Sequence, residues 1–250
     1  MKLTKAERAE NRAAFSTMRL SEKLDYIFEY YKFPLVLALI VAVAAGSVAY
    51  NRLSRKNALL YAAWANLSVG DTLERAMNEG YARDIGANPR KDEVYLYRGL
   101  YLSQDASADN HQYAYASQLK VLAAMANRQV DVMLMNREAY DIMSAGGYLL
   151  PLDGLLAGAD ALRRRVSDAL AENTVILEDN DIEYRLNEEG DYRAVTETAV
   201  NAIELSAFPL FEQAGFSGEV YLGVIGNSPR LDAALQYIDY LTSERGCEAP

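Results

Sequence analysis

The chain has 250 residues, with 25 Lys and Arg against 35 Asp and Glu, a formal net charge of −10 at pH 7. Hydrophobic residues make up 51% of the sequence, which is globular usage and excludes a chain that is disordered throughout. The single Cys excludes a disulfide-stapled fold and a Cys-based zinc or iron–sulfur site. The single His disfavours a multi-histidine metal site or a His-based triad. The acidic balance disfavours nucleic acid as the main partner.

The charge is divided unevenly along the chain. Residues 1–56 hold ten basic and five acidic side chains, a net charge of +5, whereas residues 57–250 hold 15 basic and 30 acidic side chains, a net charge of −15. A reversal of this size between two segments indicates that they occupy two different environments.

An uncharged segment of 18 residues, 33–50, separates the two. As a helix it would be about 27 Å long, close to the roughly 30 Å core of a bilayer, and aromatic residues stand at both of its ends. A buried core helix is disfavoured because no polar face is present, and a cleaved signal peptide is disfavoured because 32 residues precede the segment. A lipoprotein anchor is excluded because no Cys directly follows it. We therefore predict an uncleaved transmembrane signal anchor over residues 33–52.

The basic residues beside this segment predict its orientation. Seven precede it, whereas three follow closely and then none until Arg75. This bias predicts a single-pass protein of the cell membrane, with a cytoplasmic N-terminus and an extracellular C-terminal domain. Residues 1–32 are expected to be a cytoplasmic segment whose amphipathic helix (Leu20, Leu24, Ile27, Phe28) leads into the span; it either docks a partner or is a simple flank that sets the topology.

From residue 57 onward, hydrophobic periodicity predicts strands alternating with helices. Apolar runs predict strands at 58–67, 93–102, 130–135, 199–206 and 219–225, and shorter β-like pieces around 174–177 and 182–186. Helical spacing predicts helices at 71–85, 111–128, 137–145, around 162–170, and from Pro229 to Leu241. This alternation predicts an α/β fold over residues 57–245, with a single mostly parallel (mixed) sheet flanked by helices.

Three stretches carry a resemblance to a known family. Residues 130–156, which end in Gly147-Tyr-Leu-Leu-Pro-Leu-Asp153, are similar to a strand–helix–turn segment of extracellular solute-binding proteins, and residues 208–241 resemble their returning strand and helix. The Tyr30-Tyr31-Lys32 edge before one anchor resembles small membrane proteins of Gram-positive bacteria with such an outer domain.

The resemblance implies a reduced type II periplasmic-binding-protein-like domain. The family uses two lobes that close on a ligand. Between Leu156 and Ala199 this chain has too few residues for a second lobe, but enough for a small excursion that carries a hairpin.

Candidate functional residues are few. No G-x-S-x-G motif, P-loop, dinucleotide fingerprint or H-E-x-x-H motif is present, so we expect no enzyme activity, no cofactor and no metal site. The acids at 178–181 and 188–191 could hold Ca²⁺ loosely or simply be solvated turns, and Tyr61, Tyr95, Tyr97 and Tyr101 could line an aromatic cleft or pack in the core.

A cleft, if present, is expected outside the carboxyl ends of the parallel strands. That rule selects Asn136, after one strand, and Asn227 and Ser228, after another, as ligand-binding candidates. Both places are also predicted helix starts, where helix capping alone explains these residue types.

These patterns leave two functions open. The first is a membrane-anchored extracytoplasmic module that binds a small solute, a peptide or an envelope partner. The alternative is a structural or accessory subunit of a membrane complex that binds no ligand. In both, the lipid bilayer contacts residues 33–50 and nucleic acid is not a partner.

Overall fold

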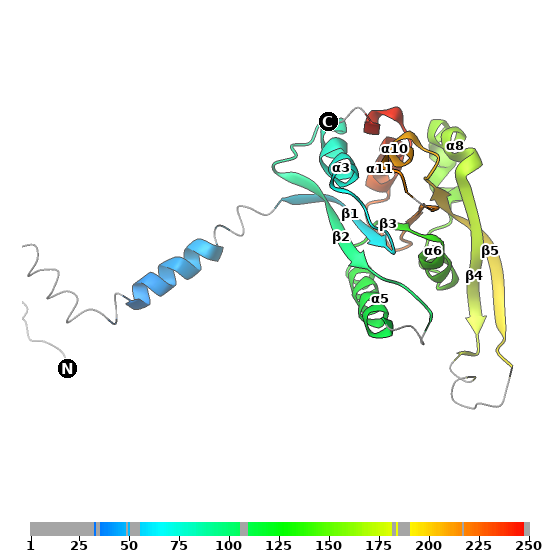
Figure 1. Ribbon diagram of the computed structural model, residues 1–250, viewed down its shortest axis with the longest axis horizontal. Helices are drawn as coiled ribbons and strands as arrows, with labels where there is room; N and C mark the ends of the chain where they lie inside the picture. The colour runs from blue at the N-terminus through cyan, green and yellow to red at the C-terminus, as the bar shows by residue number, and fades with distance from the viewer. Residues whose placement is uncertain are drawn as a thin grey trace, which may run out of the picture. The chain divides into compact units, whose positions relative to one another are not determined.

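The computed structural model describes residues 33, 36–48, 50, 56–105, 110–181, 184, 191–216 and 218–247 (Figure 1). The chain divides into two compact units, Met1–Arg55 and Lys56–Pro250. In the first unit residues 36–48 are helical and their large apolar side chains are exposed. Within the described part of the chain, none of the helices combines the length and the apolar character that a membrane crossing requires. The predicted cytoplasmic segment 1–32 and several residues of the predicted span lie outside the described residues.

The second unit is built on one six-stranded sheet. Its strands are β1 (Asn57–Ala65), β2 (Asp92–Leu100), β3 (Val132–Met135), β4 (Leu170–Asp179), β5 (Ala194–Glu204) and β6 (Tyr221–Val224), and their order across the sheet is β2-β1-β3-β6-β5-β4. β1 pairs in parallel with β2 and β3, whereas β6 is antiparallel to both β3 and β5, and β4 is antiparallel to β5.

The prediction of a mixed α/β sheet flanked by helices is therefore confirmed, but the prediction that most pairings are parallel is wrong. Three of the five neighbouring pairs are antiparallel. The physical reason is that β4 and β5 pair with each other as an antiparallel hairpin, and that β6 runs opposite to both of its neighbours.

Helices cover both faces of this sheet. They are α3 (Asp71–Arg75), which continues through a π-helical turn η1 (Ala76–Gly80) into α4 (Tyr81–Asp84), then α5 (His111–Ala126), α6 (Arg137–Ala145), α7 (Leu152–Leu155), α8 (Asp160–Val166), α10 (Pro209–Ala214) and α11 (Leu231–Leu241). Short 3₁₀ turns follow α7, α8 and α11, at Leu156–Gly158, Ser167–Ala169 and Glu244–Cys247.

Residue parity along β1 decides which helices pack on which face. Leu60, Ala62 and Trp64 point to the core that contains α3, α4, α8, α10 and α11, whereas Ala63 and Ala65 point to a second core formed with α5 and α6. Because both faces of the central strands are covered, these strands are apolar at almost every position, which explains the continuous hydrophobic runs in the sequence.

The β4–β5 hairpin projects from this body (Figure 1). Its strands pair with each other from Leu170–Ile203 to Asp179–Ala194, but only Ile203 and Glu204 of β5 pair with β6. The hairpin occupies the part of the chain for which the sequence predicted a small hairpin-bearing excursion in place of a second lobe.

Candidate functional site

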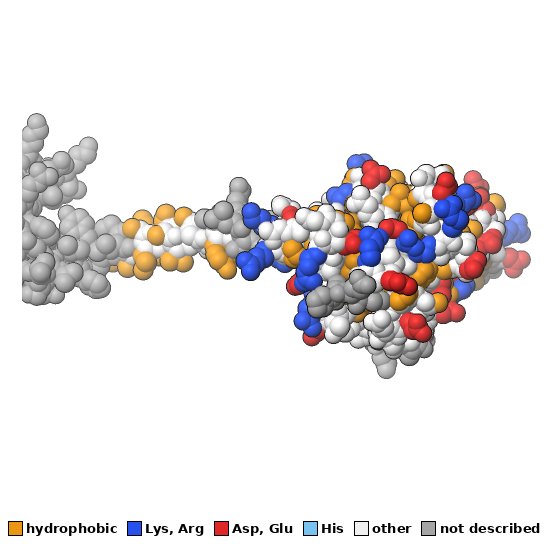
Figure 2. Space-filling view, turned by 90° about the horizontal axis from the view of Figure 1, so that it is seen from above, with side chains coloured by type: hydrophobic (Ala, Val, Ile, Leu, Met, Phe, Trp, Pro, Cys, Tyr) orange, Lys and Arg blue, Asp and Glu red, His pale blue; other side chains and the backbone are white. Residues whose placement is uncertain are grey.

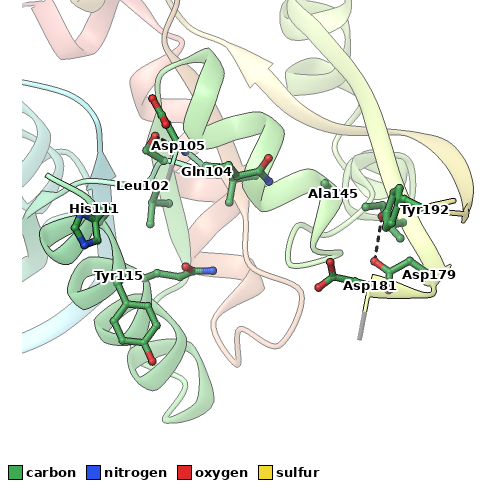
Figure 3. Close-up of a pocket in the computed structure, with 14 residues that line it drawn as sticks. Leu102, Gln104, Asp105, His111, Tyr115, Ala145, Asp179, Asp181 and Tyr192 are labelled. Atoms are coloured by element: carbon green, nitrogen blue, oxygen red, sulfur yellow. Dashed lines mark hydrogen bonds between the residues drawn. The ribbon is translucent and has the colours of Figure 1, made fainter. Parts of the chain in front are cut away.

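A cleft of about 950 Å³ lies between α5 and the β4–β5 hairpin. One wall consists of the segment that follows β2 and the first turns of α5, the opposite wall is the far end of the hairpin, and the end of α6 lies between them (Figure 3). The lining residues are Leu102, Ser103, Gln104, Asp105, His111, Ala114, Tyr115, Gln118, Ile142, Ala145, Ile176, Asp179, Asp181 and Tyr192.

The cleft is acidic on both walls. Asp105 lies on the α5 side, and Asp179 and Asp181 lie opposite it (Figure 3). An adjoining hollow of about 380 Å³, which shares Asp105 with the cleft, is also lined by Glu138 and Asp141. Among the described residues, no Lys or Arg lines either cavity. An arrangement of carboxylates with tyrosine rings, here Tyr115 and Tyr192, is suited to a positively charged solute.

Hydrogen bonds hold the far end of the hairpin in shape. The carboxylate of Asp179 accepts from the Tyr192 hydroxyl at 3.2 Å and from the backbone N–H of Asp181 at 3.3 Å. Across the hairpin, the Asn180 side chain accepts from the N–H of Arg193 at 2.7 Å. Desolvation, and then the hydrogen bond and the charge of Asp179, raise the pKa of Tyr192, so this residue presents a neutral phenol to the cleft.

A buried polar network joins α6 to the hairpin beneath the cleft. The Asn201 side chain accepts from the Tyr140 hydroxyl at 2.8 Å and donates to the Ser144 hydroxyl at 2.8 Å. Ser144 in turn donates to the Thr174 carbonyl at 2.9 Å. Tyr140, Ser144 and Asn201 are each at most 1% exposed, so the network fixes the angle between α6 and the hairpin from inside the core.

The structure does not bring the three predicted ligand-binding residues together, and none of them lines the cleft. Asn136 follows the carboxyl end of β3 and caps α6, since its side-chain oxygen accepts from the N–H of Ala139 at 2.9 Å. Because β6 runs antiparallel to β3, the end of β6 that leads to Asn227 and Ser228 lies at the opposite edge of the sheet.

At that opposite edge the other two candidates have structural partners. The Asn227 side chain donates to the Met125 carbonyl at the end of α5, at 2.9 Å, and the Ser228 hydroxyl donates to Asp131 at 2.6 Å. The expectation that they lie at the same edge of the sheet as Asn136 is therefore wrong, because β6 runs opposite to β3.

Sequence reasoning missed Asp131 and Arg230. Asp131 is fully buried, and its carboxylate accepts from Ser228, from the backbone N–H of Tyr61 at 2.8 Å, and from Arg230 Nε at 2.8 Å. Its signal in the sequence is a lone acid inside the apolar run 130–135, where a charge is tolerated only with dedicated partners.

Three of the four tyrosines proposed for an aromatic cleft form a cluster elsewhere. The rings of Tyr61 and Tyr95 are 5.5 Å apart, those of Tyr95 and Tyr97 are 5.0 Å apart, and the Arg230 guanidinium lies 4.7 Å from the Tyr61 ring centre. Tyr101 instead stacks on Tyr113. The tyrosines that do line the cleft, Tyr115 and Tyr192, carry no distinguishing pattern in the sequence.

Of the acids at 178–181, Asp179 and Asp181 line the cleft. Within the described ranges, no group of three or more His, Cys, Asp or Glu side chains is arranged to hold a metal ion.

No protein-family model matches the chain, and no characterised protein or solved structure shows significant similarity to it. What the protein does is therefore inferred from its own residues, above all from those that line the cleft.

Proposed function

We propose that the protein is a membrane-anchored, extracytoplasmic module, similar to a reduced solute-binding protein, whose cleft binds a small positively charged solute. The observation that carries the proposal is the cleft between α5 and the β4–β5 hairpin. It has a volume of about 950 Å³, within the range of small-molecule sites, and it is lined by acids but by no described Lys or Arg. In this proposal the hairpin takes the place of the family's second lobe.

The pairing of the stretches that resemble the family supports the proposal. β3, from residues 130–156, pairs with β6, from residues 208–241, in the middle of the sheet. The turn segment after α6 also joins β6, because the Leu150 N–H donates to the Val224 carbonyl at 2.8 Å and Leu149 bridges to Ile225. The resembling segments therefore form one continuous structural unit.

The described part of the predicted span supports the membrane anchor. Residues 36–48 form a helix whose large side chains are Val36, Leu37, Leu39, Ile40, Val41, Val43 and Val48, all of them exposed. Exposed apolar surface costs about 25 cal/mol per Å² in water, and a helix that is apolar on all sides gains most from a hydrocarbon environment.

A melting assay tests the ligand proposal. Residues 56–250 contain both core clusters, so this unit can be titrated with amines, polyamines, cationic amino acids, neutral sugars and organic acids. We expect only cations to raise the melting temperature, because a ligand at 100 times its Kd stabilises the folded state by about 2.7 kcal/mol. Asp105→Asn combined with Asp181→Asn should remove the shift, while Asp232→Asn, at an exposed position of α11, should leave it intact.

The melting assay can contradict the ligand proposal in two ways. No shift with any millimolar cation would contradict ligand binding, and a shift that survives the double substitution would place the site elsewhere. Release of the full-length chain from membranes by alkaline carbonate would contradict the proposed membrane span. A C-terminal domain that stays protected from protease added to intact cells would contradict the orientation.

One observation favours the alternative of an accessory subunit. Leu177 and Val195, on neighbouring strands of the hairpin, are 54% and 57% exposed, and apolar side chains of this kind could contribute to a protein contact. If this function holds, Leu177→Ser with Val195→Ser should abolish cross-linking of the hairpin to membrane proteins without changing the melting temperature, and no solute should bind.

A further inference from the structure

A second hollow, of about 590 Å³, lies at the end of the α/β unit where its chain begins. Three cationic side chains line it, Lys56, Arg83 and Arg90, together with Glu79, Asn88 and Pro89. The backbone N–H of Asn57, the first residue of β1, donates to the Lys91 carbonyl at 2.7 Å, and this bond places the 88–91 turn beside the start of β1.

The acids near this hollow are already engaged. Glu79 pairs with Arg83 at 3.0 Å, and Glu93 pairs with Lys56 at 3.6 Å. Asp92 accepts from the Asn57 side chain at 3.1 Å and from the Asn88 N–H at 3.0 Å.

Arg90 and Lys91, by contrast, are exposed and have no ion-pair partner among the residues that the structure describes. A local excess of positive charge therefore exists on a domain whose net charge is −15. Figure 2 shows Lys and Arg side chains at the end of this unit where its chain begins.

The length of the connecting chain restricts what this hollow can reach. Six residue steps join Tyr50, at the end of the uncharged segment, to Lys56 in the hollow, and a fully extended chain covers at most about 3.6 Å per residue. Lys56 therefore stays within about 22 Å of Tyr50. If residues 33–50 span a bilayer, as proposed above, the hollow is held next to the lipid headgroups, at a distance that a modest tilt of the domain can close.

We propose that the Lys56–Arg83–Arg90 hollow binds the phosphate groups of anionic lipids on the domain's side of the membrane and seats the domain on that surface. Guanidinium groups form paired hydrogen bonds with phosphate, and cations next to an anionic membrane are attracted to it. The acidic remainder of the domain is repelled by the same surface, so contact through this end alone is favoured.

Contact of this hollow with the membrane surface would also orient the cleft. The hollow lies at the amino ends of β1 and β2, whereas Leu102 and Asp105 of the cleft follow the carboxyl end of β2. Nine residues of strand separate the two ends, about 30 Å at 3.3 Å per residue. A domain seated on the hollow therefore turns the cleft away from the bilayer, toward the space from which a solute arrives.

Vesicle sedimentation tests this contact without the anchor. Residues 56–250 should bind vesicles that contain 30% phosphatidylglycerol, bind poorly to pure phosphatidylcholine, and dissociate as salt is raised. Each cation lost should weaken binding about fivefold, so Arg83→Gln with Arg90→Gln should weaken it more than tenfold. The matched control, Arg163→Gln with Arg164→Gln at exposed positions of α8, makes the same change in net charge and should bind like the wild type.

Three outcomes would overturn the proposal: equal loss in both double variants, equal binding to neutral vesicles, or complete displacement by millimolar inorganic phosphate, which would mark a site for the free anion. The anchor is tested separately by carbonate extraction of the full chain. Vesicle binding by residues 56–250 would stand even if that extraction released the chain, so the two proposals fail independently.

Discussion

The side chain of Arg230, just before α11, reaches the fully buried carboxylate of Asp131, just before β3, with Nε 2.8 Å from a carboxylate oxygen. The same guanidinium donates to the Arg128 carbonyl at 2.7 Å, at the end of α5. One side chain therefore joins the last helix, the centre of the sheet and α5. The Asp131 carboxylate also accepts hydrogen bonds from the Ser228 hydroxyl and from the Tyr61 N–H of β1. Together with Arg230, these groups compensate its charge from three sides.

Replacement of Arg230 tests the importance of this pair. Arg230→Met keeps most of the side-chain volume but leaves a buried carboxylate without its cation, so we expect the free energy of unfolding to fall by about 3 kcal/mol. Urea denaturation of residues 56–250 measures this change. Arg163→Met, at an exposed position of α8, should change stability by less than about 0.5 kcal/mol. A loss at Arg230 no larger than that of the control would show that Ser228 and the β1 backbone suffice.

The contrast between Asp131 and Asn136 shows what the sequence could predict. The cap at Asn136 is local, since its side chain contacts a residue three positions later, and the pattern of the sequence identified the helix start correctly. The partners of Asp131 lie 70 to 99 residues away. Only the tertiary fold brings them together. The sequence therefore indicates a buried acid but does not indicate which residues compensate its charge.

Substitution of Asn136 distinguishes a helix cap from a ligand-binding residue. Asn136→Ala removes the acceptor for the Ala139 N–H, and we expect the melting temperature to fall by an amount equivalent to about 1 kcal/mol. Asn136→Asp retains the cap and should restore the stability. Any melting shift produced by a cationic solute should have the same size in all three proteins. Loss of the ligand-induced melting shift in Asn136→Ala would show that Asn136 contributes to ligand binding.

The direction of β6 explains why the site residues chosen from the sequence differ from those of the cleft. A short apolar run such as 219–225 predicts a strand, but its direction depends on the path of the preceding chain. Here α10 and the hairpin return the chain so that β6 runs opposite to β3. The cleft is likewise assembled from segments between Leu102 and Tyr192 that no local pattern connects, although the predicted hairpin-bearing excursion supplies one wall.

The Asn201 network predicts how firmly the hairpin is held against α6. Asn201→Leu has a similar volume but removes one partner each from Tyr140 and Ser144, and we expect a loss of about 2 kcal/mol. Amide hydrogen exchange should accelerate in β4 and β5 more than in β1 and β3, because the hairpin loses its attachment to the core. Asn127→Leu, at the exposed end of α5, provides the control. Uniform acceleration in all strands would contradict a local role.

The two tyrosines of α11 that lie in the core predict opposite effects of the same substitution. The Tyr237 hydroxyl is fully buried and has no hydrogen-bond partner among the described residues, whereas the Tyr240 hydroxyl donates to the Ala76 carbonyl at 2.8 Å. Tyr237→Phe removes an unsatisfied polar group and should stabilise the protein by about 1 kcal/mol. Tyr240→Phe should destabilise it by a similar amount. Equal changes in both variants, measured by urea denaturation, would contradict this difference.

Tyr81, Tyr237 and Tyr240 form a buried tyrosine cluster, which predicts how stability declines at alkaline pH. Burial, and secondarily the charge of Asp84, raise the pKa of Tyr81 to about 12, and burial raises that of Tyr237 well above its ordinary value. Tyrosines in the unfolded chain ionise near pH 10. Between pH 10 and about 12 the unfolded state therefore releases protons that the folded state retains, so the stability present below pH 10 is lost as the pH rises through this interval.

Denaturation at a series of pH values should show this decline, and Tyr237→Phe should make it shallower because one of the groups that differ between the two states is gone. Tyr115→Phe removes a tyrosine from the exposed surface of α5, so its curve should run parallel to that of the wild type. Because the buried cluster ties α4 to α11, through ring contacts of 4.8 Å between Tyr81 and Tyr237 and 5.6 Å between Tyr81 and Tyr240, its ionisation should separate these helices first. Near-UV circular dichroism of the tyrosines should therefore change before the far-UV signal of the sheet.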